Sequence, residues 1–218
     1  MLSEIRTLFL KDIRTEFRQR ASLNGILLYL ISTVFVVYLI FATVDDLSTW
    51  IALFWIVLIF AATNATINSF KAESNRQFFY YYSLCNPKSI IFSKLGFNSL
   101  LLIVIAALNY VLFSSLVSNP IENNTVFILT IILGTFSISS ILTLTSAIAS
   151  KTNNNSTLTA ILSFPILLPT LLTAIKASML SGLGFGWEDC QVYLLTLVLL
   201  NVVTIALSYI LFPYLWRS

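Results

Sequence analysis

Few residues of this chain belong to the types that carry out covalent, redox or metal chemistry. The 218 residues include no histidine and two cysteines, Cys85 and Cys190, neither of which belongs to a CxxC pair. Without histidine the chain lacks the usual metalloprotease and Ser/His sets, and its scattered Met and Cys residues offer no convincing axial ligands for haem. A GxxxxGK[ST] loop for ATP is also missing. We therefore predict a chain that is not an enzyme and that binds no metal or cofactor of its own.

The polar side chains inside the apolar runs are amides and hydroxyls. Asn64 and Asn68 are four residues apart, so they share one face of a helix. Further along, a hydroxyl stripe recurs at spacings of 4, 4, 3 and 4: Thr135, Ser139, Thr143, Ser146 and Ser150. Small polar residues on one stripe let helices pack closely in lipid. The alternative for both sets is the lining of a substrate path, and we favour packing.

The elements that hold these residues are predicted to be membrane-spanning helices. Apolar residues make up 58% of the chain and charged residues 10%, and mean hydropathy is +0.91, whereas a soluble domain has about a quarter charged residues. Six runs lack Asp, Glu, Lys and Arg, and each exceeds the roughly 20 residues that a helix needs to cross a bilayer. We predict an all-α integral membrane protein, with residues 1–218 forming one membrane domain. Its six spans are expected at about 24–44, 49–70, 96–118, 125–149, 157–177 and 192–214.

The distribution of charge predicts the orientation of these spans. If the N-terminus is cytoplasmic, 11 of the 12 basic residues fall on the inner side and only Lys176 falls outside. The expected outer loops carry Asp45, Asp46, Glu122, Glu188 and Asp189. Because Lys and Arg are retained on the cytoplasmic side, both termini are predicted to be cytoplasmic. The basic residues thus report topology, and no nucleic-acid partner is expected. No charge lies in the middle of a span, which disfavours ion-coupled transport.

Two segments outside the spans are predicted to be amphipathic. In residues 2–20, apolar residues recur at helical spacing and Lys11, Arg14 and Arg18 lie opposite them, the pattern of an interfacial helix on the bilayer. The alternative is a merely soluble N-terminal helix. Residues 71–95 form the long inner loop, with room for a short helix that carries Glu73 and Arg76 on its polar side. Asn before Pro at 86–87 predicts that a new helix begins at Pro87.

The fifth expected span contains Pro165 and Pro169, four residues apart. Each proline removes one backbone donor, so we predict a kinked or partly unwound helix and a candidate hinge. The segment after it, 176–190, contains a GxGxG string that follows no strand and is not a nucleotide loop. We interpret this segment as a re-entrant or interfacial turn.

The order of these features resembles the permease subunit of an ABC exporter with short cytoplasmic loops. More narrowly, it is similar to the haem exporter protein B (CcmB) family of cytochrome c maturation. The matching stretches are Leu10 through Arg18, Phe70 with Glu73, Pro87 through Lys94, and Leu162 through Leu171. The resemblance extends over nearly the whole chain and rests mainly on the order of the motifs.

This resemblance implies a permease that pairs with a separate ABC ATPase subunit and with a second membrane subunit that handles haem. The complex would lie in the bacterial plasma membrane as a hetero-oligomer, with a homodimer of this chain as a further option. ATP would bind the ATPase, haem would be held by a partner, and hydrolysis would drive haem handling or release of a haem chaperone. Glu73 and Arg76 would contact the ATPase, or else pair with each other, in which case Arg14 and Arg18 would supply the contact.

Two other functions stay open from the sequence. A permease of the same architecture could export another substrate, such as a lipid, a drug or a polysaccharide. A non-transporting membrane scaffold for an assembly complex would also fit the spans. Binding of an ATPase separates both permease functions from the scaffold, and a defect in the haem chaperone separates haem export from other export.

Overall fold

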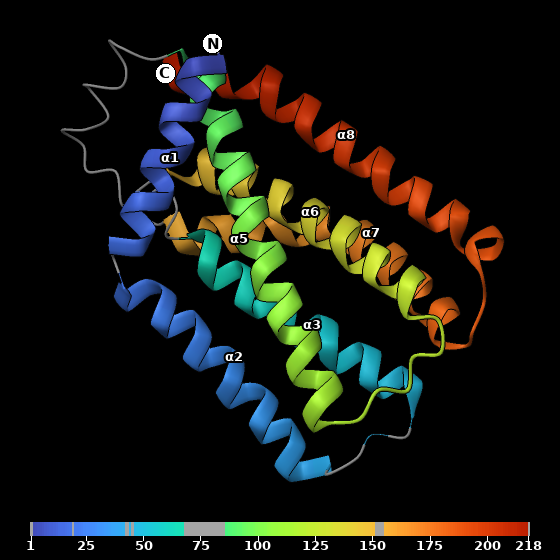
Figure 1. The fold of residues 1–218 in the computed structure, drawn as a ribbon. Coiled ribbons are helices and arrows are strands. Elements are labelled where there is room, and N and C mark those ends of the chain that lie inside the picture. Colours follow the sequence, from blue (N-terminus) through green and yellow to red (C-terminus); the bar gives the residue numbers. More distant parts are fainter. Residues whose placement is uncertain are drawn as a thin grey trace.

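A computed structural model describes residues 2–18, 20–41, 44, 46–67, 86–150 and 155–217. These residues form helices and connecting turns, with no strand among them (Figure 1). The helices are α1 (Leu2–Arg18), α2 (Arg20–Phe41), α3 (Leu47–Ile67), α5 (Pro87–Leu116), α6 (Asn124–Ala149), α7 (Asn155–Gly182) and α8 (Trp187–Arg217).

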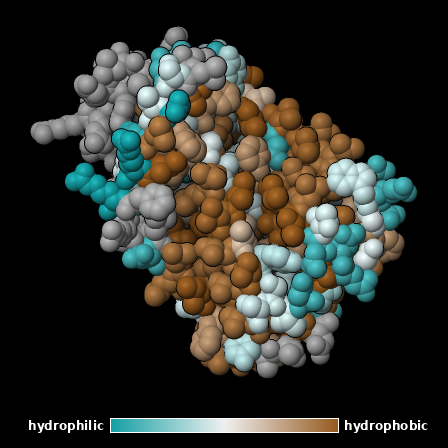
Figure 2. Space-filling view, in the orientation of Figure 1, coloured by the Kyte–Doolittle hydropathy of each residue, from teal (hydrophilic) through white to brown (hydrophobic). Residues whose placement is uncertain are grey.

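Six of the helices, α2 to α8, are long and apolar enough to cross a membrane. They correspond in order to the six expected spans. Their outward faces are apolar, as at Leu28 on α2 and Val192 on α8, which are 72% and 64% exposed. Figure 2 shows a broad hydrophobic surface between hydrophilic patches toward opposite ends of the molecule. This distribution is the one expected of a multi-pass membrane protein, whose solvent around the middle is hydrocarbon.

Helix α6 occupies the centre of the bundle. Of its membrane-spanning window, 67% is buried, compared with 22–44% for the other five helices. It packs against α3, α5, α7 and α8. Toward its N-terminal end, Phe127 joins an aromatic cluster with Trp50 and Phe54 of α3 and Phe113 of α5, whose rings lie 5.5–5.8 Å apart. Aromatic pairs at such distances stabilise by about 0.5–1.5 kcal/mol beyond their burial.

The three connections predicted to lie outside the cell meet at one end of the bundle. The Val44 amide donates to the Val117 carbonyl at 3.5 Å, and the Asn123 amide donates to the Ser181 carbonyl at 3.0 Å. The Trp50 indole also donates to the Ser118 carbonyl. Both chain ends lie together at the opposite end (Figure 1). Successive connections therefore lie at alternating ends of the bundle, as the distribution of charges predicts.

The predicted turn over 176–190 is shorter than expected and is not re-entrant. Helix α7 continues to Gly182 and α8 begins at Trp187, which leaves a turn of four residues. Gly184 has φ +83° and stops α7, because its amide and that of Phe185 fold back onto the carbonyls of Ser181 and Leu180. This is a Schellman motif, which needs a left-handed residue at that position. Lys176 does not interrupt the helix, since its side chain is exposed.

Helix α5 begins at Pro87, as the sequence predicts. The Asn86 side chain accepts a hydrogen bond from the Lys88 amide at 3.1 Å, and Pro87 occupies the first turn, where its missing donor costs nothing. At 30 residues, α5 extends from the end where the chain termini lie to the end where the three connections meet. Its first two turns therefore lie beside α1.

Candidate functional site at the α1 end of the bundle

Helix α1 crosses the end of the bundle that holds both termini, rather than running alongside the spans (Figure 1). It packs chiefly on α5 and more weakly on α2. The Ser89 hydroxyl donates to the Glu4 carboxylate at 2.8 Å. The Phe9 ring lies where it would touch a Cβ added at Gly96, at 3.6 Å. The sequence Leu2–Arg18 thus forms a helix that packs against the first turns of α5.

A buried ion pair lies at the centre of this contact. Lys94 Nζ of α5 is 3.3 Å from Asp12 Oδ1 of α1, and the two side chains are 6% and 7% exposed. The two helices also share an apolar cluster that includes Leu8, Ile91 and Leu95. Asp12 also lies 3.2 Å from the more exposed Lys11. Burying two charges this deeply is costly, and a close opposite charge offsets part of that cost.

Sequence reasoning missed this pair. It counted Lys94 among the inner charges that set topology and assigned no role to Asp12. No local signal pointed to it, because a lysine that directly precedes an uncharged run is the usual pattern at the cytoplasmic end of a span. The partner could not be identified in advance, since 82 positions separate the two residues.

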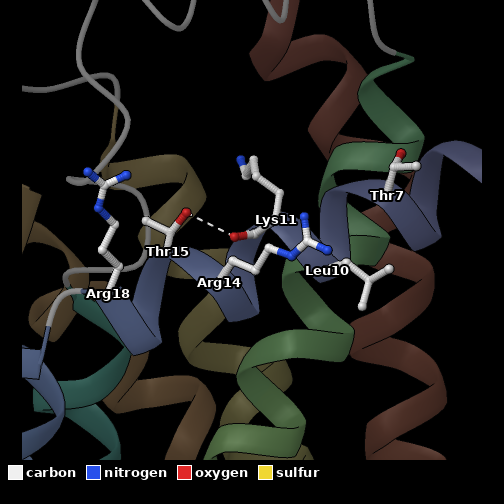
Figure 3. Close-up of a pocket in the computed structure, with 6 residues that line it drawn as sticks. All are labelled: Thr7, Leu10, Lys11, Arg14, Thr15 and Arg18. Atoms are coloured by element: carbon white, nitrogen blue, oxygen red, sulfur yellow. Dashed lines mark hydrogen bonds between the residues drawn. The ribbon is translucent and has the colours of Figure 1, made fainter.

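The opposite face of α1 is basic and exposed. It lines a groove of about 810 Å³, whose described lining residues are Thr7, Leu10, Lys11, Arg14, Thr15 and Arg18. Figure 3 shows that all six project from α1, with the Thr15 hydroxyl bonded to the Lys11 carbonyl at 2.9 Å. Arg14 and Arg18 are exposed. The groove therefore offers cationic and hydroxyl groups that suit carboxylates or phosphates.

The first turn of α5 is also held from its other side. Lys88 Nζ lies 2.6 Å from the Tyr209 hydroxyl of α8 and 4.0 Å from the centre of the Tyr209 ring. Phe92 lies against the same ring, at 6.0 Å between centroids. The start of α5 is thus fixed between α1 and the C-terminal part of α8.

The remaining predicted coupling residues, Glu73 and Arg76, lie outside the described residues, as does Asn68. Asn64 lies near the end of α3 and is exposed. The prediction that Asn64 joins helices of this bundle is therefore not supported by its position. The pattern showed two amides on one face, but it did not show whether that face points inward.

The hydroxyl stripe of α6 lies in the core of the bundle, with Thr135, Ser139 and Thr143 no more than 1% exposed. Thr143 accepts from the Asn98 amide of α5 at 2.9 Å, and Ser139 lies 3.2 Å from the Ser99 hydroxyl. The Thr135 hydroxyl is buried without a hydrogen-bond partner in the described part of the chain. Two of the three residues thus contact α5, which is consistent with the packing interpretation.

The candidate hinge residues Pro165 and Pro169 are both inside α7 and exposed. Of the two expected forms, the partly unwound one is wrong, since α7 is an α-helix from Asn155 to Gly182 without a break, and the kinked one stays a prediction. A proline inside a membrane helix leaves the carbonyl four residues earlier without its amide donor, and a neighbouring helix, a Ser or Thr side chain or a water must satisfy it. For Pro165 and Pro169 these are the carbonyls of Ile161 and Pro165, and both residues are exposed on the outer face of α7. Whether this stretch acts as a hinge stays a prediction.

Metal chemistry has no visible basis in the described ranges, which hold no group of three or more Cys, Asp or Glu residues placed to bind an ion. The site instead consists of a docked helix, a buried ion pair and an exposed basic groove at one end of six apolar helices. These features define a multi-pass membrane protein with an exposed basic groove at one end.

Comparison with protein families identifies this class further. The model of the CcmB protein family matches residues 3–215, which is essentially the whole chain. The chain belongs to the CcmB family, and the resemblance found in the sequence is confirmed. This family is the membrane component of a haem-export ABC system in cytochrome c maturation. Among curated proteins, none matches this chain.

Proposed function

We propose that this chain is the permease subunit of an ABC complex that couples ATP hydrolysis on a separate subunit to haem delivery for c-type cytochromes. The observation that carries the proposal is the family match over residues 3–215. Six apolar helices support the membrane role. The complex acts either by moving haem or by releasing a haem-loaded chaperone, and a second membrane subunit handles the haem itself. The chain contributes no nucleotide site.

The placement in the bacterial plasma membrane, with both termini in the cytoplasm, belongs to the same proposal. It is supported by the distribution of basic residues, because 11 of the 12 fall on the same side of the membrane as the termini when the six spans are placed in order. In this orientation α1 lies at the cytoplasmic interface of the bilayer, and the way it crosses the end of the bundle supports an interfacial helix (Figure 1).

The ATPase contact is assigned to the cytoplasmic face. Two regions offer charges there: the 71–95 loop with Glu73 and Arg76, and the α1 groove with Arg14 and Arg18. A charge-assisted hydrogen bond contributes about 1.5–3 kcal/mol when it is desolvated, whereas an exposed ion pair contributes less than about 1 kcal/mol. A subunit that lacks a nucleotide site must receive work through such contacts.

Co-purification of the ATPase tests this assignment. The paired variants Glu73→Ala/Arg76→Ala and Arg14→Ala/Arg18→Ala are expected to insert normally and to weaken recovery of the ATPase or uncouple its turnover. Arg6→Ala is the matched control, because Arg6 is an exposed cation on α1 that does not line the groove. Full recovery and turnover in both paired variants would place the contact elsewhere.

The substrate is tested in a strain that lacks this chain. Loss of c-type cytochromes, with a haem chaperone that stays loaded, is expected. Normal cytochromes alongside a defect in lipid, drug or polysaccharide export would identify a different exporter. A chain that recovers no ATPase under any condition would point to a non-transporting scaffold.

A further inference from the structure

Helix α1 has one face that contacts α5 and an opposite face that is basic and exposed. Asp12 points into the contact with α5, and Arg14 is two residues further on, about 200° around the helix at 3.6 residues per turn. Arg18 lies about 240° from Asp12 by the same geometry. The structure agrees, since Asp12 is buried and both arginines are exposed. A partner bound to the basic face would therefore exert force on a helix whose opposite face is attached to α5.

The contact between Asp12 and Lys94 forms at only one position of α1 relative to α5. The paired atoms of Asp12 and Lys94 are 3.3 Å apart, and both side chains are almost fully buried. Sliding or rotating α1 would leave two poorly hydrated charges without each other, which is strongly unfavourable. An apolar contact alone would tolerate such a shift more easily, because it has no directional requirement. Buried polar pairs fix register in other helical assemblies for the same reason.

Neighbouring contacts spread the attachment along α1. The bond from Ser89 to Glu4 and the contact of Phe9 with Gly96 flank the ion pair. On α5 all of these partners lie within its first ten residues, which overlap the C-terminal part of the predicted 71–95 coupling loop. From there α5 continues as one helix to Leu116.

We propose that Asp12 and Lys94 pin α1 to α5, so that a displacement of the exposed basic face of α1 is transmitted to a membrane span. The two residues are positioning residues and contact neither ATP nor the transported group. The pin, by which we mean the attachment of α1 to α5 through Asp12 and Lys94, is a property of this chain alone. The transmission of a displacement from α1 to the span rests on the proposed function.

The pin is tested first, by a distance measurement that requires no activity. Spin labels are attached at Leu10 of α1 and Leu108 of α5, which are 41% and 39% exposed, in a background of Cys85→Ser and Cys190→Ala. We expect a single narrow distance distribution for the otherwise unaltered chain in bilayers. Asp12→Asn and Lys94→Met are expected to broaden it, and the exchanged pair Asp12→Lys/Lys94→Asp is expected to narrow it again.

Lys11→Gln is the matched control, because it removes the half-buried second cation beside the same carboxylate. It should leave the distribution narrow. Distributions that stay narrow in both single variants would overturn the pin. If the single variants fail to insert, the exchanged pair decides: insertion with a narrow distribution supports the pin, and failure to insert overturns it.

Transmission is tested in the complex with the ATPase. Asp12→Asn should retain the ATPase while permease-dependent turnover falls by about tenfold or more, and the exchanged pair should recover most of it. A broadened distance with unchanged turnover would overturn transmission and leave the pin. If the unaltered complex shows no permease-dependent turnover, the proposed function fails and transmission with it, while the distance measurement still reports on the pin.

Discussion

Thr143 and Thr130 are both buried threonines of α6, but their hydroxyls make different bonds. Thr143 accepts from Asn98 of α5 in addition to donating within its own helix. Within the described part of the chain, Thr130 donates only to the Val126 carbonyl, one turn earlier in α6. Hydrogen bonds between helices in a membrane contribute about 0.6 kcal/mol on average and up to about 1.7 kcal/mol. Individual polar residues thus differ in what they contribute even when burial is equal.

Thr143→Val should therefore destabilise the bundle more than Thr130→Val. Valine keeps the shape of threonine and removes the acceptor for Asn98, at an expected cost of about 1 kcal/mol. The measurement is unfolding in mixed micelles of increasing denaturing-detergent content, followed by tryptophan fluorescence. Equal midpoints for the two variants would show that the Asn98 bond adds nothing to stability.

At the scale of the elements, close approach of α3 to α6 depends on one glycine. A Cβ added at Gly134 would lie 2.7 Å from Trp55 Cη2 and 3.3 Å from Cζ3. Trp55 cannot retreat freely, because its indole donates to the Ser178 hydroxyl of α7 at 3.0 Å and its side chain is 1% exposed. Three helices therefore meet at a position that accepts no side chain.

Gly134→Ala is expected to destabilise the bundle by about 1–3 kcal/mol, the usual cost of overpacking a core. Gly25→Ala is the control, since a Cβ at Gly25 meets nothing within 4 Å and alanine favours the helix. Thermal unfolding in detergent compares the two. A Gly134→Ala chain as stable as the Gly25→Ala chain would mean that Trp55 moves without penalty.

The prolines of α7 test whether a continuous helix still acts as a hinge. Pro165→Ala together with Pro169→Ala restores two backbone donors. We expect assembly with the ATPase to be preserved and the turnover of the complex to slow, because a stiffer α7 resists a change between two arrangements. Leu168→Ala, an exposed apolar change between the prolines, is the control. Unchanged turnover in the double variant would show that the prolines are mechanically inert.

Sequence reasoning located the elements well and their contacts poorly, for physical reasons. The spans could be found because hydrocarbon excludes charge, and the start of α5 could be found because an Asn-Pro cap is a local signal. The end of α7 was misplaced by five residues, since the exposed Lys176 does not end a helix and the Schellman turn at Gly184 was not recognised. The Asp12–Lys94 pair and the exposure of Asn64 depend on which faces meet, and this is set by tertiary packing.

For the molecule as a whole, the two ends differ in chemistry. One end gathers the turns at Val44, at Ser118–Asn123 and at Leu183–Gly186, together with the acidic residues Asp46, Glu122, Glu188 and Asp189. The other end holds α1, with its basic groove, and the start of α5 with Lys88 and Lys94. Between them lies the apolar surface (Figure 2). A chain with this asymmetry is expected to insert in a single orientation, with the basic end in the cytoplasm.

Labelling of single cysteines in intact cells tests that orientation. In a background of Cys85→Ser and Cys190→Ala, a membrane-impermeant maleimide should label Glu122→Cys and Glu188→Cys, since both positions are exposed at the acidic end. Arg14→Cys is exposed at the basic end and should react only after the membrane is permeabilised, and Arg76→Cys should behave in the same way. Each position thus serves as the control for the other end. Labelling of Arg14→Cys or Arg76→Cys from outside would show that the topology is inverted. It would also contradict the proposal that the α1 groove meets a cytoplasmic ATPase.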